Sequence, residues 1–76
     1  MNKIRRNQLE EIANKLERLQ SELYLLKDEE EEYYENMPES IQGGEKGDRA
    51  YEVIDILEEA GCSFDELAET IRSAAE

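Results

Sequence analysis

Several residue types that carry chemistry are absent or scarce in this chain of 76 residues. It has no histidine, so the commonest general base and metal-binding imidazole is missing. Its single cysteine, Cys62, excludes an intramolecular disulfide and a multi-cysteine metal site, and no histidine is present to activate it as a nucleophile. These absences predict a protein that is not an enzyme and that holds no metal or cofactor. A lone cysteine is also typical of a cytoplasmic, reducing setting.

Long apolar runs are missing, and so is a surplus of positive charge. Polar and acidic residues follow the basic N-terminus where a signal peptide needs an apolar stretch, and no segment approaches membrane-spanning length. The chain has 21 acidic and nine basic residues, which gives a formal net charge of −12. Nucleic acid and anionic membranes repel such a chain, so we expect direct binding to neither. The charge serves either solubility or the engagement of a basic surface on another protein.

Aromatic residues that could build a large core are few, since the chain has no tryptophan and one phenylalanine. Aliphatic side chains must therefore supply most of the core, and at this length a single core is marginally stable. We expect one domain over residues 1–76. Because a two-helix unit buries only one stripe per helix, we also expect a second copy or another partner to cover the rest.

The strongest pattern that is present is an apolar run in the first half of the chain. Its spacings of three and four residues, followed by a last step of seven, are the a/d rhythm of a helix packed on another helix, with the following members: Leu9, Ile12, Leu16, Leu19, Leu23, Leu26 and Tyr33. Leu9, Leu16 and Leu23 take position a and the others position d. The pattern predicts a helix over about residues 2–35, with Asn2 as its N-cap.

A second helix follows a connection at about residues 36–47, which contains Pro38 and three glycines. Pro38 can start a short helical turn there, and Asp48 is the expected N-cap of the second helix, over about 48–75. With Ala50 at position a, the main seam residues of this helix are Val53, Leu57, Phe64, Leu67 and Ile71. Gly61 and a possible capping box at Ser63 and Glu66 allow a bend or break, whereas the unbroken heptad phase favours one continuous helix.

The distribution of charge predicts that the two helices are antiparallel. The first helix is basic at its N-terminus and acidic at its C-terminus, which opposes its own dipole. An antiparallel partner reduces this conflict because it places each charged end beside the opposite pole of the other helix. The predicted fold is therefore all-α: an antiparallel helical hairpin that dimerises into a four-helix bundle.

The densest charge of the chain lies at residues 28–35 and is followed through the second helix by acidic residues away from the seam. These residues form either a solvated helix surface or an acidic and aromatic surface that binds arginine and lysine of a partner. Consecutive carboxylates on a regular helix point in different directions, which disfavours a metal site. The candidate partner-binding residues are Asp28, Glu29, Glu31, Glu32, Tyr34, Glu35, Glu52, Asp55 and Glu59.

The chain resembles small acidic helical proteins of phages and mobile elements of Gram-positive bacteria. The resemblance rests on the basic opening at residues 2–6, the acidic run at 28–35, the connection at 36–42 with the sequence NMPESIQ, and residues 50–60. Such proteins are largely uncharacterised, and they include inhibitors of host defences. The resemblance identifies no functional residue.

Two functions follow as hypotheses. The first is a non-catalytic inhibitor of a host defence protein, such as a CRISPR effector or a restriction enzyme, that occupies a basic nucleic-acid-binding site in the host cytoplasm. The alternative is a structural or assembly protein that works through helix–helix self-association.

Overall fold

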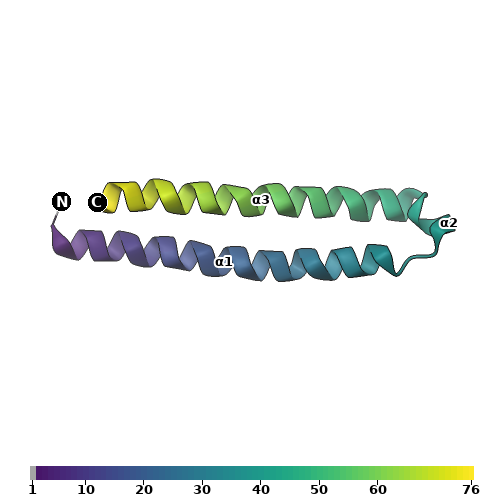
Figure 1. Cartoon of the computed structure of the whole chain (residues 1–76), viewed down its shortest axis with the longest axis horizontal. Helices are drawn as coiled ribbons and strands as arrows, with labels where there is room; N and C mark the ends of the chain where they lie inside the picture. The colour runs from purple at the N-terminus through teal and green to yellow at the C-terminus, as the bar shows by residue number, and fades with distance from the viewer. Residues whose placement is uncertain (1) are drawn as a thin grey trace.

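The computed structural model of the chain describes residues 2–76 and shows an antiparallel helical hairpin (Figure 1). Helix α1 (Lys3–Glu35) and helix α3 (Glu45–Ala75) run side by side, and the short helix α2 (Glu39–Gln42) lies in the connection between them. The molecule is a rod with extents of 59, 15 and 11 Å. The N and C labels lie together at one end of the rod, here named the terminal end, and the connection lies at the other, the loop end (Figure 1). The predicted all-α hairpin is confirmed.

Helix α1 begins and ends as the sequence predicts. The side-chain Oδ1 of Asn2 accepts a hydrogen bond of 2.8 Å from the backbone N–H of Arg5, so Asn2 is the N-cap. The first turn of α1 has no acidic residue and its last turn has no basic one. The acidic C-terminal end of α1 therefore lies in an unfavourable field of its own helix, and it is placed beside the positive N-terminal pole of α3.

The connection after α1 is held by hydrogen bonds around Pro38. The carbonyl of Pro38 accepts bonds from the backbone N–H groups of Ile41, at 2.8 Å, and Gln42, at 3.0 Å. The side-chain amide of Gln42 donates a bond of 2.9 Å to the carbonyl of Tyr34, one of the last carbonyls of α1. The short helical turn predicted after Pro38 is confirmed, and it caps the end of α1.

Helix α3 begins at Glu45, so the prediction that Asp48 is its N-cap is wrong. Gly44 is the N-cap, with extended backbone angles, and the N–H of Asp48 donates to the carbonyl of Gly44 inside the helix. Gly47 is buried against the backbone of Gln42, which occupies the space that a side chain at position 47 would need. This close contact allows the helix to start directly after the turn. Asp48 lies in the first turn, where its charge favours the helix dipole.

Helix α3 is continuous through Gly61, which confirms one of the two predicted alternatives and excludes the break. The hydroxyl of Ser63 donates a bond of 3.2 Å to the carbonyl of Glu59, as a residue inside a helix does. The ring of Tyr24 occupies the space that a side chain at Gly61 would fill, and Gln20 donates a bond of 2.7 Å to the carbonyl of Gly61. Glycine at this position therefore permits a close approach of α1.

The contact between the two helices, the α1–α3 seam, uses heptad positions a and e. The e positions carry small residues at several levels, and three of them, Ala13, Gly61 and Ala68, are buried. The a positions carry half-buried residues, which include the predicted seam residues Leu9, Leu16, Leu23, Leu57, Phe64 and Ile71. Small e residues let the two backbones come close together, which rotates each helix so that its a/e edge faces the other.

The apolar residues at position d remain outside this seam. Ile12, Leu19, Leu26 and Tyr33 of α1 are between 46% and 57% exposed, and Leu67 of α3 is 49% exposed, while Val53 is half-buried. The predicted a/d seam is thus divided: its a residues pack within the hairpin, and most of its d residues face outwards. Within residues 2–76, the only hydrophobic side chains classed as buried are Ala13, Ala50 and Ala68.

Candidate functional site

The hairpin has two broad faces of opposite character. On one side of the seam, charged and aromatic residues contact one another across the helices, so this side of both helices forms a single polar face. Position d lies on the other side of the seam in each helix, next to position g. The d residues of both helices therefore share the opposite broad face, the apolar face. With Ile56 from position g, it consists of Ile12, Leu19, Leu26, Tyr33, Val53, Ile56, Ala60 and Leu67.

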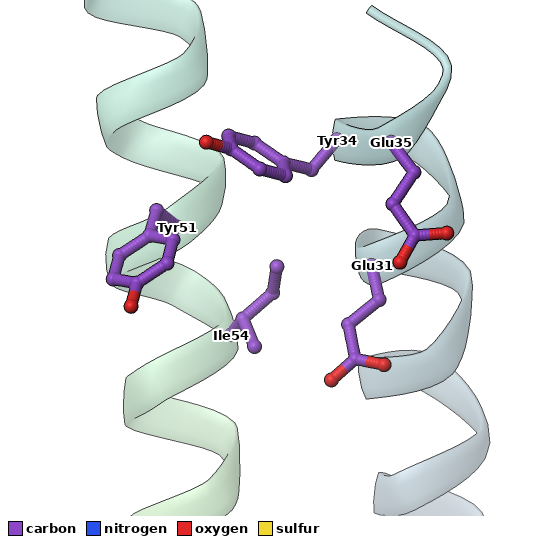
Figure 2. Close-up of a pocket in the computed structure, with 5 residues that line it drawn as sticks. All are labelled: Glu31, Tyr34, Glu35, Tyr51 and Ile54. Carbon is purple, nitrogen blue, oxygen red and sulfur yellow. The ribbon is translucent and has the colours of Figure 1, made fainter. Parts of the chain in front are cut away.

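The polar face carries an open pocket near the loop end, here named the tyrosine–glutamate pocket. It has a volume of about 320 Å³ and is lined by Glu31, Tyr34, Glu35, Tyr51 and Ile54. Figure 2 shows Tyr34 extending from α1 towards α3, with Glu31 and Glu35 together on the α1 side. The two tyrosine rings lie 6.0 Å apart between centroids and are tilted by 59°. Two carboxylates and two aromatic rings thus surround one opening.

The chemistry of this pocket suits a cation. A carboxylate forms charge-assisted hydrogen bonds with guanidinium or ammonium groups, and a tyrosine ring attracts the same groups to its face. Glu31 already accepts an ion pair of 3.3 Å from Lys27. For Glu35, no ion pair forms among the residues that the structure describes. The pocket can therefore accept a further positive group.

Lys27 joins the pocket to the rest of the polar face. Its ammonium nitrogen lies 2.7 Å from a carboxylate oxygen of Glu58 on α3 and 5.6 Å from the centroid of the Tyr24 ring. The hydrogen bond that Lys27 donates to Glu58, followed by the one it donates to Glu31, raises the pKa of Lys27 above its ordinary value. Burial raises the pKa of the neighbouring Tyr24 hydroxyl. Lys27 therefore stays charged and ties the two helices together.

A second polar cluster ties the helices together towards the terminal end. Arg72 of α3 pairs with Glu17 and, at 3.3 Å, with Glu10 of α1, and it donates a hydrogen bond of 2.9 Å to Asn14. The bond from Arg72 holds the pKa of Glu17 below its ordinary value of 4.5, and it raises the pKa of Arg72 itself. The cluster neutralises α1 carboxylates that would otherwise repel the acidic α3.

The candidate partner-binding residues do not form one patch. Asp28, Glu31, Glu35 and Asp55 occupy the b and f positions of the polar face, and Tyr34 lies at its inner edge. Glu32, Glu52 and Glu59 occupy position c on the outer edges of the rod, where Glu52 pairs with Arg49 at 3.3 Å. Glu29 occupies position g, at the rim of the apolar face. Only Glu31, Tyr34 and Glu35 of this set line the pocket.

Sequence reasoning missed Tyr51 and Ile54 as pocket residues. Both lie on α3, and their proximity to residues 31–35 depends on how far α3 is shifted along α1. The length of the connection sets that shift, and the starting point of α3 was predicted too late. A signal was present, because an antiparallel hairpin with a tight turn pairs tyrosines placed at similar distances from the turn.

The apolar face has a smaller depression of about 140 Å³, lined by Ala60, Ser63, Phe64 and Leu67. Small residues at Ala60 and Ser63 leave it between the larger side chains of Phe64 and Leu67. It lies beside the exposed d residues of α1, such as Leu19. This face therefore has both projecting side chains and space to receive them.

Cys62 is exposed on a regular stretch of α3. Over residues 2–76, no group of three or more acidic or cysteine side chains is placed as metal ligands are. In the same part of the chain, no helix has an apolar stretch long enough to cross a bilayer.

Comparison of the chain with models of protein families, with curated proteins and with solved structures finds no match. The geometry of the two faces is therefore what indicates a function for this chain.

Proposed function

We propose that the chain is a non-catalytic protein-binding module whose tyrosine–glutamate pocket takes an arginine or lysine side chain from a basic surface of another protein. The observation that carries this proposal is the placement of two carboxylates, Glu31 and Glu35, beside two tyrosine rings, Tyr34 and Tyr51, around one opening. Tyrosine, and arginine on the partner side, are among the residues that dominate the energetics of many protein interfaces. The net charge of −12 adds long-range attraction to a basic partner.

The resemblance to small acidic phage proteins suggests which basic partner to consider. A basic nucleic-acid-binding site on a host defence protein, such as a CRISPR effector or a restriction enzyme, presents closely spaced arginine and lysine residues. Occupation of that site by an acidic rod would exclude nucleic acid. The pocket and the nearby carboxylates Asp28, Glu32 and Asp55 supply the negative charges for such contacts.

The pocket can be tested with hexa-arginine as the probe, titrated by calorimetry and followed residue by residue by NMR. We expect the largest shift changes at Tyr34 and Tyr51. The double variant Glu31→Gln and Glu35→Gln should raise the Kd about fivefold, because each exposed charge pair contributes roughly 0.2–1 kcal/mol. The matched control, Glu66→Gln with Glu69→Gln, removes the same charge far from the pocket and should leave the Kd nearly unchanged.

Equal weakening by the two double variants would show that general charge, and not the pocket, binds the probe. The identity of the partner requires a separate experiment. Tagged protein is used to capture proteins from a host lysate at low and high salt. A nucleic-acid-binding protein retained at low salt by the wild type, and lost with Glu31→Gln and Glu35→Gln, would support the inhibitor function.

A second candidate function is self-assembly, as in an assembly protein of a phage or mobile element. The observation that favours it is the apolar face, where Leu19, Leu26 and Leu67 are each about half exposed or more. Soluble monomers rarely expose a continuous apolar surface of this kind without a partner. The homodimer predicted from the sequence, which is compatible with either function, would be the basis of this second one. In the capture experiment, an assembly protein would retain copies of itself or other assembly proteins.

A further inference from the structure

We propose that the apolar face binds the apolar face of a second copy of this chain, with the two loop ends at opposite ends of the dimer, to form an antiparallel four-helix bundle. This inference rests on the second candidate function and specifies its partner, its surface and its orientation. It does not depend on the tyrosine–glutamate pocket, which lies on the other face.

The heptad pattern fits this arrangement better than it fits an isolated hairpin. At 3.6 residues per turn, position d lies about 80° around the helix from the centre of the a/e edge that contacts the other helix. In a four-helix bundle, each helix contacts two neighbours that lie roughly at right angles to each other. The a/e edge of α1 makes the first contact, with α3, and its d stripe is oriented for the second. Positions a and d then point together towards the centre of the bundle.

A single hairpin buries too little apolar side-chain surface to account for the number of large apolar residues in its two helices. Among residues 2–76, no large side chain is fully buried. The broad face measures 59 by 15 Å, a footprint of roughly 900 Å², and stable protein interfaces bury about 800 Å² per partner. Docking of a second copy would cover Leu19, Leu26 and Leu67, and it would supply the core that one hairpin lacks.

The levels of the side chains along the rod are also suited to a two-fold axis at its middle. The hydrogen bond between Gln20 and Gly61 fixes Leu19 and Ala60 at the same level. With the loop ends opposed and the axis at this level, Leu19 meets Leu19 of the second copy, and Ala60 provides space beside them. Ile12 then meets Leu26 of the second copy. The central layer thus combines large and small side chains, which allows close packing.

The distribution of charge selects the orientation. With the loop ends opposed and the axis at position 19, residues 32–35 at the acidic end of α1 lie at the level of residues 3–6 of the other copy, which places Glu32 near Arg6 and Glu35 near Lys3. Lys15 and Glu22, both at position g, also face each other across the α1–α1 contact, twice per dimer. With the loop ends together, Glu29 would approach Arg49 of the second copy, but the two acidic runs would meet at one end. The repulsion between those runs disfavours that orientation.

The first experiment measures the solution mass by light scattering. We expect twice the 8.9 kDa of the chain for the wild type. Leu19→Asp places two carboxylates together at the two-fold axis and should raise the dissociation constant of the dimer by about 100-fold or more. The matched control is Leu25→Asp, because Leu25 lies on the same helix at position c and is 65% exposed. The control should keep the dimer mass, and a monomeric wild type would overturn the proposal.

A second experiment tests the orientation and does not require a destabilising substitution. In a Cys62→Ser background, Leu19→Cys is oxidised mildly. With the loop ends opposed, the two residues at position 19 are close enough for a disulfide, so a covalent dimer should form rapidly. With the loop ends together, position 19 faces position 60 of the second copy, and only a mixture of Leu19→Cys and Ala60→Cys chains would cross-link. Preferential cross-linking of the mixture would overturn the proposed orientation, even for a protein of dimer mass.

Discussion

The two broad faces of the hairpin differ in whether their side chains find contacts within the same chain. On the polar face, Arg72, Lys27 and Tyr34 each find a partner on the opposite helix of the same chain. On the apolar face, Leu19, Leu26 and Leu67 are about half exposed or more. The polar side chains that cross the seam therefore find their contacts within one chain, whereas the large side chains of the apolar face are left exposed by the hairpin. This difference indicates that the polar contacts hold the two helices together, and that the polar face has only the tyrosine–glutamate pocket open while the apolar face is exposed along its length.

The largest loss of stability is expected for a substitution at Leu26, an exposed residue of the apolar face. Leu26 is 57% exposed in the single chain, and substitution of an exposed residue usually changes stability by less than about 0.5 kcal/mol. If a second copy buries it, Leu26→Ala should cost about 2–4 kcal/mol of unfolding free energy per chain, as for a core leucine. Chemical denaturation at two protein concentrations measures this, and a cost near zero at both would make the apolar face a free surface.

An intermediate loss of stability is expected when Gly47 or Gly61 is replaced by alanine. A side chain at Gly47 would collide with the backbone of Gln42, which cannot move without displacing the turn. Gly47→Ala should therefore lower the unfolding free energy by about 1–2 kcal/mol, despite the helix propensity that alanine adds. Gly61→Ala meets only the outer end of the Tyr24 ring, which can swing away. Its cost should be smaller, and thermal unfolding of both variants with circular dichroism compares them directly.

The smallest loss of stability is expected when an ion pair of the polar face is removed. Arg72→Gln removes the exposed ion pairs to Glu10 and Glu17 and should lower the Tm by only a few degrees. Because Arg72 holds the pKa of Glu17 below 4.5, the stability from this pair is fully present above that pH and is lost as the pH falls through the lowered pKa. The difference in Tm between wild type and variant should therefore vanish in strong acid.

The matched control for this effect is Arg18→Gln, because Arg18 is exposed at position c of α1. It should leave the Tm nearly unchanged at every pH. A difference for Arg72→Gln that persisted unchanged into strong acid would mean that its side chain stabilises the hairpin by packing and not by pairing with Glu17.

The sequence predicted the path of the chain better than the detail of its seam. Asn2 as a cap, the turn after Pro38 and the antiparallel direction follow from local chemistry and charge, and these features are confirmed by the structure. The heptad pattern identified the a residues that pack in the seam, but it also assigned the exposed d residues to that seam. It could not show that small residues at Ala13, Gly61 and Ala68 draw the a/e edges together. That depends on the fit of two surfaces, which a pattern along one helix does not describe.

The candidate site was predicted in part for a similar reason. Glu31, Tyr34 and Glu35 were identified from their density in the sequence, and all three line the pocket. Tyr51 and Ile54 were missed because their position beside α1 depends on the turn around Gly44 and Gly47. A residue belongs to a pocket between two helices only through their relative shift, and that shift is a property of the connection.

The position of the tyrosine–glutamate pocket, at the loop end and on the polar face, determines the valency of the dimer proposed above. Opposed loop ends place the two pockets at opposite ends of a rod about as long as one hairpin, 59 Å. Because the apolar faces meet, the two polar faces point away from each other. The dimer would therefore bridge two separate partner molecules. It would gain no avidity on one flat surface, because its two pockets could not bind that surface at the same time.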